Sequence, residues 1–360
     1  MTLFIQRILE KIGHLLESGP LLARAKPLFD AIDSFLLSRE TVTPAAPHIR
    51  DAMELKRFMI LVVAAAMPLA LFSIYQYGWR AVAIILVSYL CGVGAEAVFV
   101  VARREEFTEG AFVSCMLYPL TLPPTIPLWM AGLGIIVGIV FGKEVFGGTG
   151  KNIFNPALVG RVFIAVAFPV EMTTRWLMPA SGGLGRFTAY TSDTVTGATP
   201  LIVYKGTRAV TPVADLFFGN IPGSLGEGCK ILILAAGLFL ILTRIVNWRL
   251  PVSMLGAVWV ASYFGSALWP ERIAPPMFQL LSGGLLFGAV FMVTDPVTCP
   301  VTRPGKYIYG VLCGLLTVLI RNFSGYVEGV MFAILFMNIF APLIDETVFL
   351  LTFREKRASQ

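Results

Sequence analysis

Ten stretches of apolar residues, most of them close to the length of a membrane span, constrain this chain more than any other feature. They lie near residues 58–76, 81–102, 110–122, 125–143, 153–170, 230–247, 251–269, 277–294, 306–322 and 327–351. A helix needs about 20 apolar residues to cross the hydrocarbon of a bilayer. Only 14% of the residues are charged, whereas soluble domains contain about 25%. The sequence therefore predicts an all-α polytopic membrane protein.

Short motifs occur twice, once in each half of the chain. Pro-x-Thr-x-Pro ends both the third segment (residues 119–123) and the eighth (296–300), while NIFNPAL begins the fifth and NIFAPLI lies in the tenth. Two matches in the same order indicate a duplication of five spans. An odd number of spans makes the second copy enter the membrane from the opposite side, as in many transporters. We therefore predict two inverted five-helix repeats, whose short, proline-broken third and eighth segments meet near the midplane under a cover of protein or water.

This pattern divides the chain into five regions. Residues 1–57 form an amphipathic N-terminal segment, 58–170 the first repeat, 171–229 a long polar loop, 230–351 the second repeat and 352–360 a short tail. Loops rich in lysine and arginine stay in the cytosol, and a cytosolic N-terminus places most of these residues on that side. We therefore expect both termini in the cytosol and the 171–229 loop in the periplasm. Basic residues beside the spans also explain the net charge of +6 without any nucleic-acid partner.

The polar loop contains the stretch DTVTGATPL, residues 193–201, which has three threonine hydroxyls, a carboxylate and a glycine. Long loops in compact proteins are usually functional or disordered. This stretch suits a modifying enzyme, because Gly197 and Ala198 leave the backbone accessible and Asp193 places a charge near the hydroxyls. A plain surface turn is the alternative interpretation, since Thr, Gly and Asp favour turns.

Charge within apolar segments is costly and usually functional, and four ionisable side chains are candidates for such a role. Glu96 is in the second segment, Asp295 at the broken end of the eighth and Asp345 in the tenth. Arg161, in the fifth segment, is expected to neutralise one of these carboxylates. The alternative is that the carboxylates form structural buried pairs or lie at the membrane interface.

Three asparagines lie beside prolines: Asn152, Asn155 and Asn338. Their amides either repair broken backbone or hydrogen-bond the ring of a ligand such as a flavin. The loop GKEVFGGTGKN (residues 142–152) lacks the spacing of a phosphate-binding loop, so we interpret it as a tight turn. Five scattered cysteines and two histidines predict neither a disulfide framework nor a metal site.

Six motifs, spread over about residues 46–352, resemble a known family. They are RDAMELKRFMILV, LPPTIPLW, FGGTGKNIFNPALVGR, DTVTGATPL, TDPVT and NIFAPLID. This set resembles the family that contains the B subunits of sodium-translocating NADH:quinone oxidoreductases and the D subunits of Rnf complexes. The basic lead-in before the first span is more similar to the former.

The resemblance implies a subunit of a redox-driven sodium pump in the bacterial inner membrane. Its expected partners are the other subunits of a six-subunit complex (A, C, D, E and F), a flavin transferase, quinone, Na⁺ and membrane lipids. An Rnf-type subunit linked to ferredoxin is the alternative within the family. A transporter or channel without a redox role is the alternative of another class.

The resemblance also implies a covalent cofactor on the polar loop. A flavin transferase of such systems joins FMN to the last threonine of its motif through a phosphoester. Here that residue is Thr199, and Asp193, Thr196, Gly197 and Ala198 complete the motif. Thr194 stands where the family often has a smaller residue, which is a slight departure.

Further sites implied by the resemblance lie inside the membrane domain. A non-covalent riboflavin is expected near Asn152, Asn155 and Asp295. Sodium transfer is expected to involve the carboxylates Glu96, Asp295 and Asp345. Quinone is expected near Gly92, Val93 and Phe163. Val93 replaces a second glycine of the family pattern, so the quinone pocket is expected to be narrower here.

Overall fold

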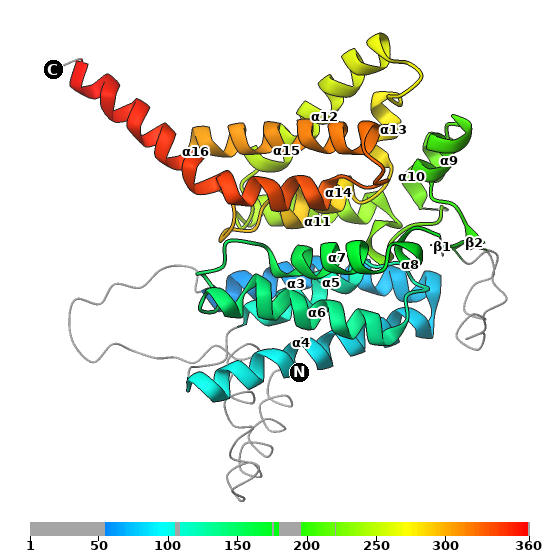
Figure 1. The fold of residues 1–360 in the computed structure, drawn as a ribbon, viewed down its shortest axis with the longest axis horizontal. Helices are drawn as coiled ribbons and strands as arrows, with labels where there is room; N and C mark the ends of the chain where they lie inside the picture. Colours follow the sequence, from blue (N-terminus) through cyan, green and yellow to red (C-terminus); the bar gives the residue numbers. More distant parts are fainter. Residues whose placement is uncertain (1–54, 105–108, 175, 180–195, 220, 359–360) are drawn as a thin grey trace, which may run out of the picture.

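The computed structural model describes residues 55–104, 109–174, 176–179, 196–219 and 221–358. Most of these residues are helical, and the helices run side by side along the long axis of the molecule (Figure 1). Residues 1–54 of the amphipathic N-terminal segment, and Asp193 and Thr194 of the polar loop, lie outside the described residues.

Six of the described helices are long and apolar enough to cross a membrane. They are α3 (Leu55–Tyr77), α4 (Trp79–Arg103), α6 (Leu128–Gly142), α12 (Arg249–Leu268), α15 (Arg303–Phe323) and α16 (Val330–Ala358). Shorter apolar helices are α5 (Gly110–Leu120), α7 (Pro156–Ala167) and α11 (Lys230–Leu242). These elements confirm the predicted polytopic, mostly helical membrane protein.

The predicted eighth segment is interrupted rather than continuous. It consists of α13 (Pro276–Leu281), the short helix α14 (Leu285–Phe287) and a π-helical turn, η5 (Gly288–Met292). The break falls at residues 282–284, where Gly283 adopts a left-handed φ of +64° that glycine tolerates best. The third segment is also short: α5 contains Pro119 and ends at Leu120.

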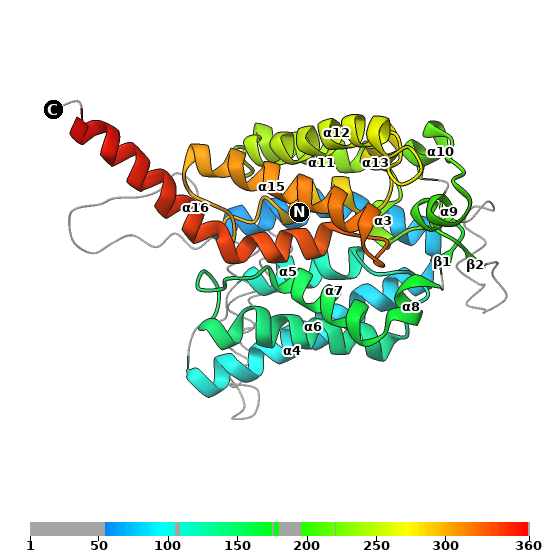
Figure 2. The same cartoon turned by 45° about the horizontal axis from the view of Figure 1, so that its top comes forward.

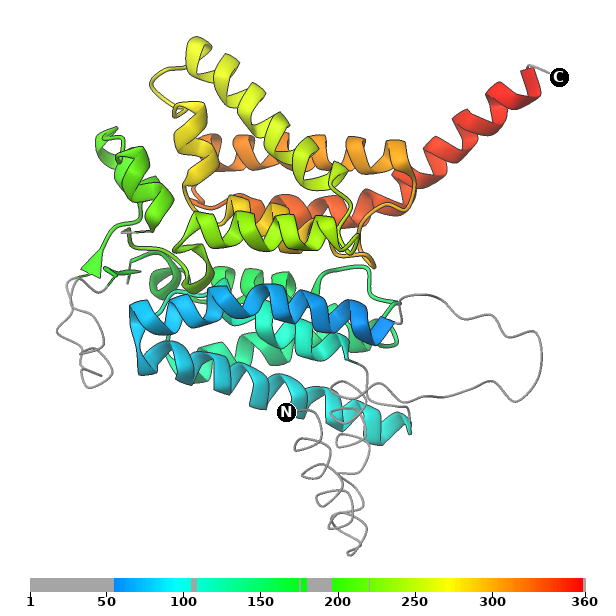
Figure 3. The same ribbon diagram turned by 180° about the vertical axis from the view of Figure 1, so that it is seen from behind.

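The helices form two groups. Helices α3 to α7 lie together, and the second group, α11 to α16, packs against them (Figures 1 and 3). At one end lie α8 (Pro169–Thr173), α9 (Pro200–Thr207), α10 (Val213–Phe218) and strands β1 (Trp176–Leu177) and β2 (Thr196–Gly197). At the other end α16 extends beyond the bundle (Figure 2), because its helix continues to Ala358 through the predicted tail.

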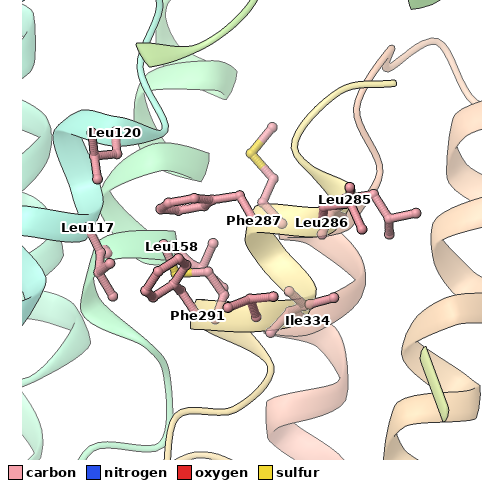
Figure 4. Packing of buried hydrophobic residues seen from close by; sticks show 14 of the residues in the cluster. Leu117, Leu120, Leu158, Leu285, Leu286, Phe287, Phe291 and Ile334 are labelled. Atoms are coloured by element: carbon pink, nitrogen blue, oxygen red, sulfur yellow. The ribbon is translucent and has the colours of Figure 1, made fainter. Parts of the chain in front are cut away.

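The short and broken segments meet where the two groups touch. Figure 4 shows Leu117 and Leu120 of α5 on one side of Phe287 and Phe291, and Ile334 of α16 on the other. All five side chains are buried. A loop that includes the 3₁₀ turn η4 (Leu225–Glu227) joins this region, because its Leu225 N–H donates to the Leu122 carbonyl at 3.0 Å. Buried apolar side chains therefore fill the contact between α5 and the interrupted eighth segment.

Helices α6 and α7 approach each other backbone to backbone along a glycine seam formed by Gly134, Gly138, Gly142 and Gly160. A Cβ atom on Gly138 would overlap the Pro156 carbonyl oxygen, and one on Gly160 would overlap that of Gly134. Small residues permit such close approach between membrane helices, where packing contacts hold the helices together. The seam fixes the N-terminus of α7 against the C-terminal part of α6.

Candidate functional site

The threonine-rich motif of the polar loop is held by a small sheet. Strand β2 pairs antiparallel with β1, so Gly197 lies opposite Trp176 and Thr196 opposite Leu177. A Cβ atom on Gly197 would lie 2.9 Å from the Met178 sulfur, which explains the small residue. Ala198 follows as an exposed residue, and Thr199 begins the next helix.

Thr199 is the N-cap of α9. Its hydroxyl oxygen accepts the backbone N–H of Ile202 at 3.4 Å, and Pro200 occupies the first helical position. Both residue choices are typical of helix starts. The N-terminus of a helix carries partial positive charge, so the Thr199 oxygen lies in a field that favours a negatively charged substituent.

Thr199 also lines a cavity of about 880 Å³, together with Trp176, Tyr326, Arg161 and Glu328. The guanidinium of Arg161 donates to Glu328 at 2.9 Å and contacts the Met172 sulfur at 3.8 Å. The prediction that Arg161 neutralises Glu96, Asp295 or Asp345 was therefore wrong, because its carboxylate partner comes from the turn before α16.

Arg161 and Glu328 also border a smaller cavity of about 370 Å³ that lies next to the broken segment and Glu227. Glu227 accepts the Ser224 hydroxyl at 2.7 Å, and its backbone carbonyl accepts the Lys230 ammonium at 2.5 Å. A row of charged groups thus runs from the Thr199 cavity to the contact between the two groups of helices.

The three residues expected around a ring-shaped ligand line one cavity. Asn152, Asn155 and Asp295 share a space of about 700 Å³, whose other walls are mainly apolar and include Leu117 and Phe291. Apolar walls with a few polar groups are typical of small-molecule sites. The structure thus brings these three predicted residues together, from both groups of helices.

Asn155 connects the two groups of helices through its side-chain amide. Its Oδ1 atom caps α7 by accepting the N–H groups of Ala157 (3.0 Å) and Leu158 (3.4 Å). Its Nδ2 atom donates to Asp295 at 3.2 Å, while Asp295 also accepts the N–H of Val297 at 3.1 Å. Asn155 therefore repairs a helix start, which was one of the two alternatives, and its amide also donates to a carboxylate in the cavity.

Asn152 has a more local role. Its Oδ1 atom accepts the Gly150 N–H at 3.3 Å and its Nδ2 atom donates to the Phe154 carbonyl at 3.0 Å. These bonds shape the turn between α6 and α7, in agreement with the predicted tight turn.

Glu96 forms a buried ion pair on the first group of helices. It is 1% exposed, and the ammonium of Lys143, 2% exposed, lies 2.6 Å from its carboxylate. Lys143 also lies 3.9 Å from Glu144, which binds Arg103 at 3.1 Å. Lys143 lines the 700 Å³ cavity, so a cation of the protein already occupies the position beside Glu96.

Asp345 acts as a clamp on the loop before α15. Its carboxylate accepts the N–H of Val301 at 2.7 Å, and both the N–H and the hydroxyl of Thr302, at 3.0 and 2.5 Å. Thr302 in turn caps α15. Asp345 thus has a structural contact of its own, in which its carboxylate holds the loop before α15.

The residues predicted for quinone are distributed over two helices. Gly92 of α4 is packed so closely that a Cβ atom would overlap the Cys115 sulfur and lie 2.9 Å from Ile135. Val93 is half-buried beside it, and Phe163 is half-buried on α7. Helix α6 packs against both α4 and α7.

Three charged partners were missed by reasoning from the sequence: Lys143, Glu227 and Glu328. Each stands outside the apolar core of a segment, next to glycines (GKE, GEG and EGV), and such places also suit ordinary turns. Asn338, the third asparagine whose amide was expected to repair backbone or bind a ring, accepts the Tyr309 hydroxyl at 2.5 Å inside the second group.

Comparisons with known proteins identify the family. A 34% identical protein of Yersinia pestis, covering 98% of this chain and 99% of its own, is named as the B subunit of the Na(+)-translocating NADH-quinone reductase. Proteins of the same name from Pseudomonas aeruginosa (strain LESB58; 36% identical) and Azotobacter vinelandii (37%) each cover 96% of both chains. The family described as NQR2, RnfD, RnfE matches residues 42–353. With these matches over nearly its whole length, the chain belongs to the NQR2, RnfD, RnfE family.

Proposed function

We propose that this protein is the membrane-embedded B subunit of a sodium-translocating NADH:quinone reductase, and that it carries FMN on Thr199. The names of the relatives above support the complex. The observation that carries the cofactor assignment is the position of the Thr199 hydroxyl, at a helix N-terminus and on the wall of a large cavity. The same names favour this function over that of an Rnf protein.

The residues around Thr199 fit a phosphoester. The threonine oxygen uses an accepting lone pair for the Ile202 N–H, so replacing the hydroxyl proton by a phosphoryl group preserves that bond. The N-terminus of α9 stabilises the added negative charge. The adjacent cavity, with Trp176 and Tyr326 in its wall, offers aromatic surface to a flat ring. Bound there, FMN supplies one- and two-electron transfer.

Flavin attachment has a direct test. The protein is produced together with a flavin transferase, and the band on a denaturing gel is examined for flavin fluorescence, with mass spectrometry of the peptide that contains Thr199. Thr199→Val should abolish the signal. Thr207→Val, a matched change at the other end of α9, should keep it. An unmodified wild-type peptide from the native membrane refutes the assignment.

Riboflavin is proposed to occupy the cavity lined by Asn152, Asn155 and Asp295. The donor set suits an isoalloxazine ring, which presents both hydrogen-bond donors and acceptors, and the apolar walls suit its faces. The test is the content of non-covalent flavin in the purified complex. Asn155→Ser, which keeps a helix-capping oxygen but removes the amide donor, should lower that content, whereas Thr207→Val should not.

The two groups of helices are proposed to be inverted repeats, residues 58–170 and 230–351, separated by a periplasmic loop at 171–229. Corresponding pairs of helices pack in each group, α4 with α6 and α12 with α15, then α6 with α7 and α15 with α16. The third and eighth segments are both short or broken. This arrangement supports the repeats. We also propose a multi-pass protein of the bacterial inner membrane with both termini in the cytosol, as the positive-inside rule favours, which reporter fusions at the C-terminus and within the loop can test.

The sodium pathway is proposed to include Asp295, Glu96 and Asp345, because hard cations prefer oxygen ligands. Asp295 lines the central cavity. To bind Na⁺, the Glu96 carboxylate must first separate from the Lys143 ammonium, and the Asp345 carboxylate must give up its three hydrogen bonds to Val301 and Thr302. Replacing Asp295 by alanine should change the sodium dependence of turnover, and an unchanged dependence removes it from the pathway. Quinone is proposed near Gly92, Val93 and Phe163, where Val93→Gly should alter inhibitor sensitivity.

A further inference from the structure

A cavity separate from those described above lies at the end of the bundle that carries α9. It has about 680 Å³ of space and is lined by Lys205, Arg208, Arg272 and Arg321, with the amides of Gln279 and Asn322. Among the described residues, no acidic side chain belongs to its lining. Four cations that converge on one cavity indicate a site for an anion.

The cations come from three elements far apart in the sequence. Lys205 is in the last turn of α9 and Arg208 is the C-cap of that helix. Arg272 lies between α12 and α13, and Arg321 is in the last turn of α15. Arg321 is buried, Lys205 is half-buried, and Arg208 and Arg272 are exposed. The positive charge therefore extends from the floor of the cavity to its rim.

Arg321 at the floor is held by neutral oxygen atoms. Its guanidinium donates to the backbone carbonyls of Gln279 (2.7 Å) and Ser282 (3.0 Å). Its Nε–H has no hydrogen-bond partner among the described residues, although the side chain is only 2% exposed. Glu328 and Glu227 both interact with Arg321 electrostatically, while Glu328 accepts hydrogen bonds from Arg161 and from the Gly284 N–H. A buried donor without a partner is unusual, and Arg321 places its positive charge at the floor of the cavity.

The other three cations have no carboxylate partner within the described part of the chain. Lys205 donates to the carbonyls of Ser324 and Tyr326 at 3.1 and 2.7 Å. Arg208 lies over the Tyr204 ring at 5.4 Å and Arg272 over the Phe323 ring at 5.9 Å. Burial, and then the charge of Arg321, lower the pKa of Lys205. The carboxylates of Glu328 and Glu227 thus offset part of the charge of Arg321, whereas no described carboxylate pairs with the other three cations.

The cavity lies beside a surface suited to the membrane interface. Trp269, 52% exposed, packs edge-on against Phe323 with ring centres 6.2 Å apart, and Leu268 beside it is 68% exposed. Aromatic residues of this kind gather at the level of the lipid headgroups. An anion with an apolar tail can therefore place its head in the cavity and its tail along the exposed apolar face of α12.

We propose that this cavity binds the phosphate group of an anionic phospholipid. Guanidinium groups bind phosphate oxygens through charge-assisted, often bidentate hydrogen bonds, and a phosphodiester offers two such oxygens. Inorganic phosphate shares this chemistry, and the two sources differ only in the tail that reaches the apolar face.

The test uses the full-length protein, purified in its complex and stripped of lipid with detergent. Its thermal unfolding is followed while phosphatidylglycerol, phosphatidylcholine or inorganic phosphate is added. Phosphatidylglycerol should stabilise the wild type more than phosphatidylcholine does. Arg208→Gln combined with Arg272→Gln should weaken its apparent affinity by about tenfold for each charged hydrogen bond removed. Arg249→Gln is the control, because Arg249 also stacks on an aromatic ring, that of Trp248, at 5.2 Å, but does not line this cavity.

The outcomes distinguish the two sources. Lipid stabilisation that disappears in the double variant and persists in the control supports the proposal. Stabilisation by inorganic phosphate alone, lost in the same variant, keeps the phosphate site but overturns the lipid as its source. Equal responses of wild type and double variant to all three additions overturn the proposal entirely.

Discussion

Asn155 offers the sharpest test of how the two groups of helices are held together, because one side chain performs two separable tasks. Its Oδ1 atom caps α7, while its Nδ2 atom donates to Asp295 across the interface at 3.2 Å. Asn155→Ser keeps a capping oxygen and loses the bond to Asp295. Asn155→Ala loses both.

The expected magnitudes follow from these contacts. Loss of an N-cap costs about 1 kcal/mol, and a hydrogen bond to a charged group contributes about 1.5–3 kcal/mol. We therefore expect Asn155→Ser to lower the free energy of unfolding by about 1.5–3 kcal/mol and Asn155→Ala by about 2.5–4 kcal/mol. The difference between the free energies of unfolding of the two variants gives the contribution of the helix cap.

The assay is reversible unfolding of the protein in detergent micelles by added denaturing detergent, followed by tryptophan fluorescence. A double-mutant cycle with Asp295→Ser measures the bond across the interface. We expect a coupling energy above about 1 kcal/mol, since neighbouring residues in one network give about 0.5–3 kcal/mol. The reasoning is refuted if Asn155→Ala is no more destabilising than an exposed substitution, or if the effects of Asn155→Ser and Asp295→Ser simply add.

Three further predictions concern other contacts. Lys143→Met removes the ammonium that lies 2.6 Å from the buried Glu96 carboxylate and should lower the free energy of unfolding by about 3–5 kcal/mol. Adding Glu96→Gln should recover part of this loss in the same unfolding assay. No recovery would argue against the ion pair. Gly134→Ala places a Cβ atom on a tyrosine hydroxyl and should cost about 1–3 kcal/mol, whereas Gly94→Ala, with no atom within 4 Å, should be neutral or stabilising. Because burial lowers the pKa of Lys205, the unfolded chain binds this proton more strongly than the folded protein does. The free energy of unfolding should therefore rise as the pH approaches the ordinary lysine pKa of about 10.4. Lys205→Gln should flatten that rise in melting curves recorded without anionic lipid, and an unchanged slope would contradict the assignment.

The helices were predictable because apolar length decides them. The segment expected at 81–102 is α4, Trp79–Arg103, since nothing in that run stops a helix before its basic end. The segment expected at 153–170 is shorter than predicted. Its helix begins at Pro156 because Asn155 caps it, and it ends at Ala167, where a second short helix starts with Pro169. Capping residues and prolines determine where such helices begin and end, whereas hydrophobicity alone overestimates the length of the helix.

Pairing of charges was not predictable from the sequence. Arg161 lies 167 residues from Glu328 in the chain, and nothing in the local pattern selects this carboxylate over Asp295 or Asp345. The pairing depends on how the two groups of helices dock. Asn155 and Asp295 were placed near one ligand through resemblance, and the fold brings them within hydrogen-bonding distance. Residue types thus indicate which groups matter, whereas tertiary packing determines which of them meet.

The glycine seam has a mechanical consequence. Since even a Cβ atom on Gly138 or Gly160 would overlap the facing helix, α6 and α7 have little room to slide past each other, and we expect them to move as one body. Helix α7 carries both Asn155 and Arg161, whose partners belong to the other group. A joint displacement of α6 and α7 would therefore strain the Asn155–Asp295 hydrogen bond and the Arg161–Glu328 ion pair together, so both interactions would respond to one motion.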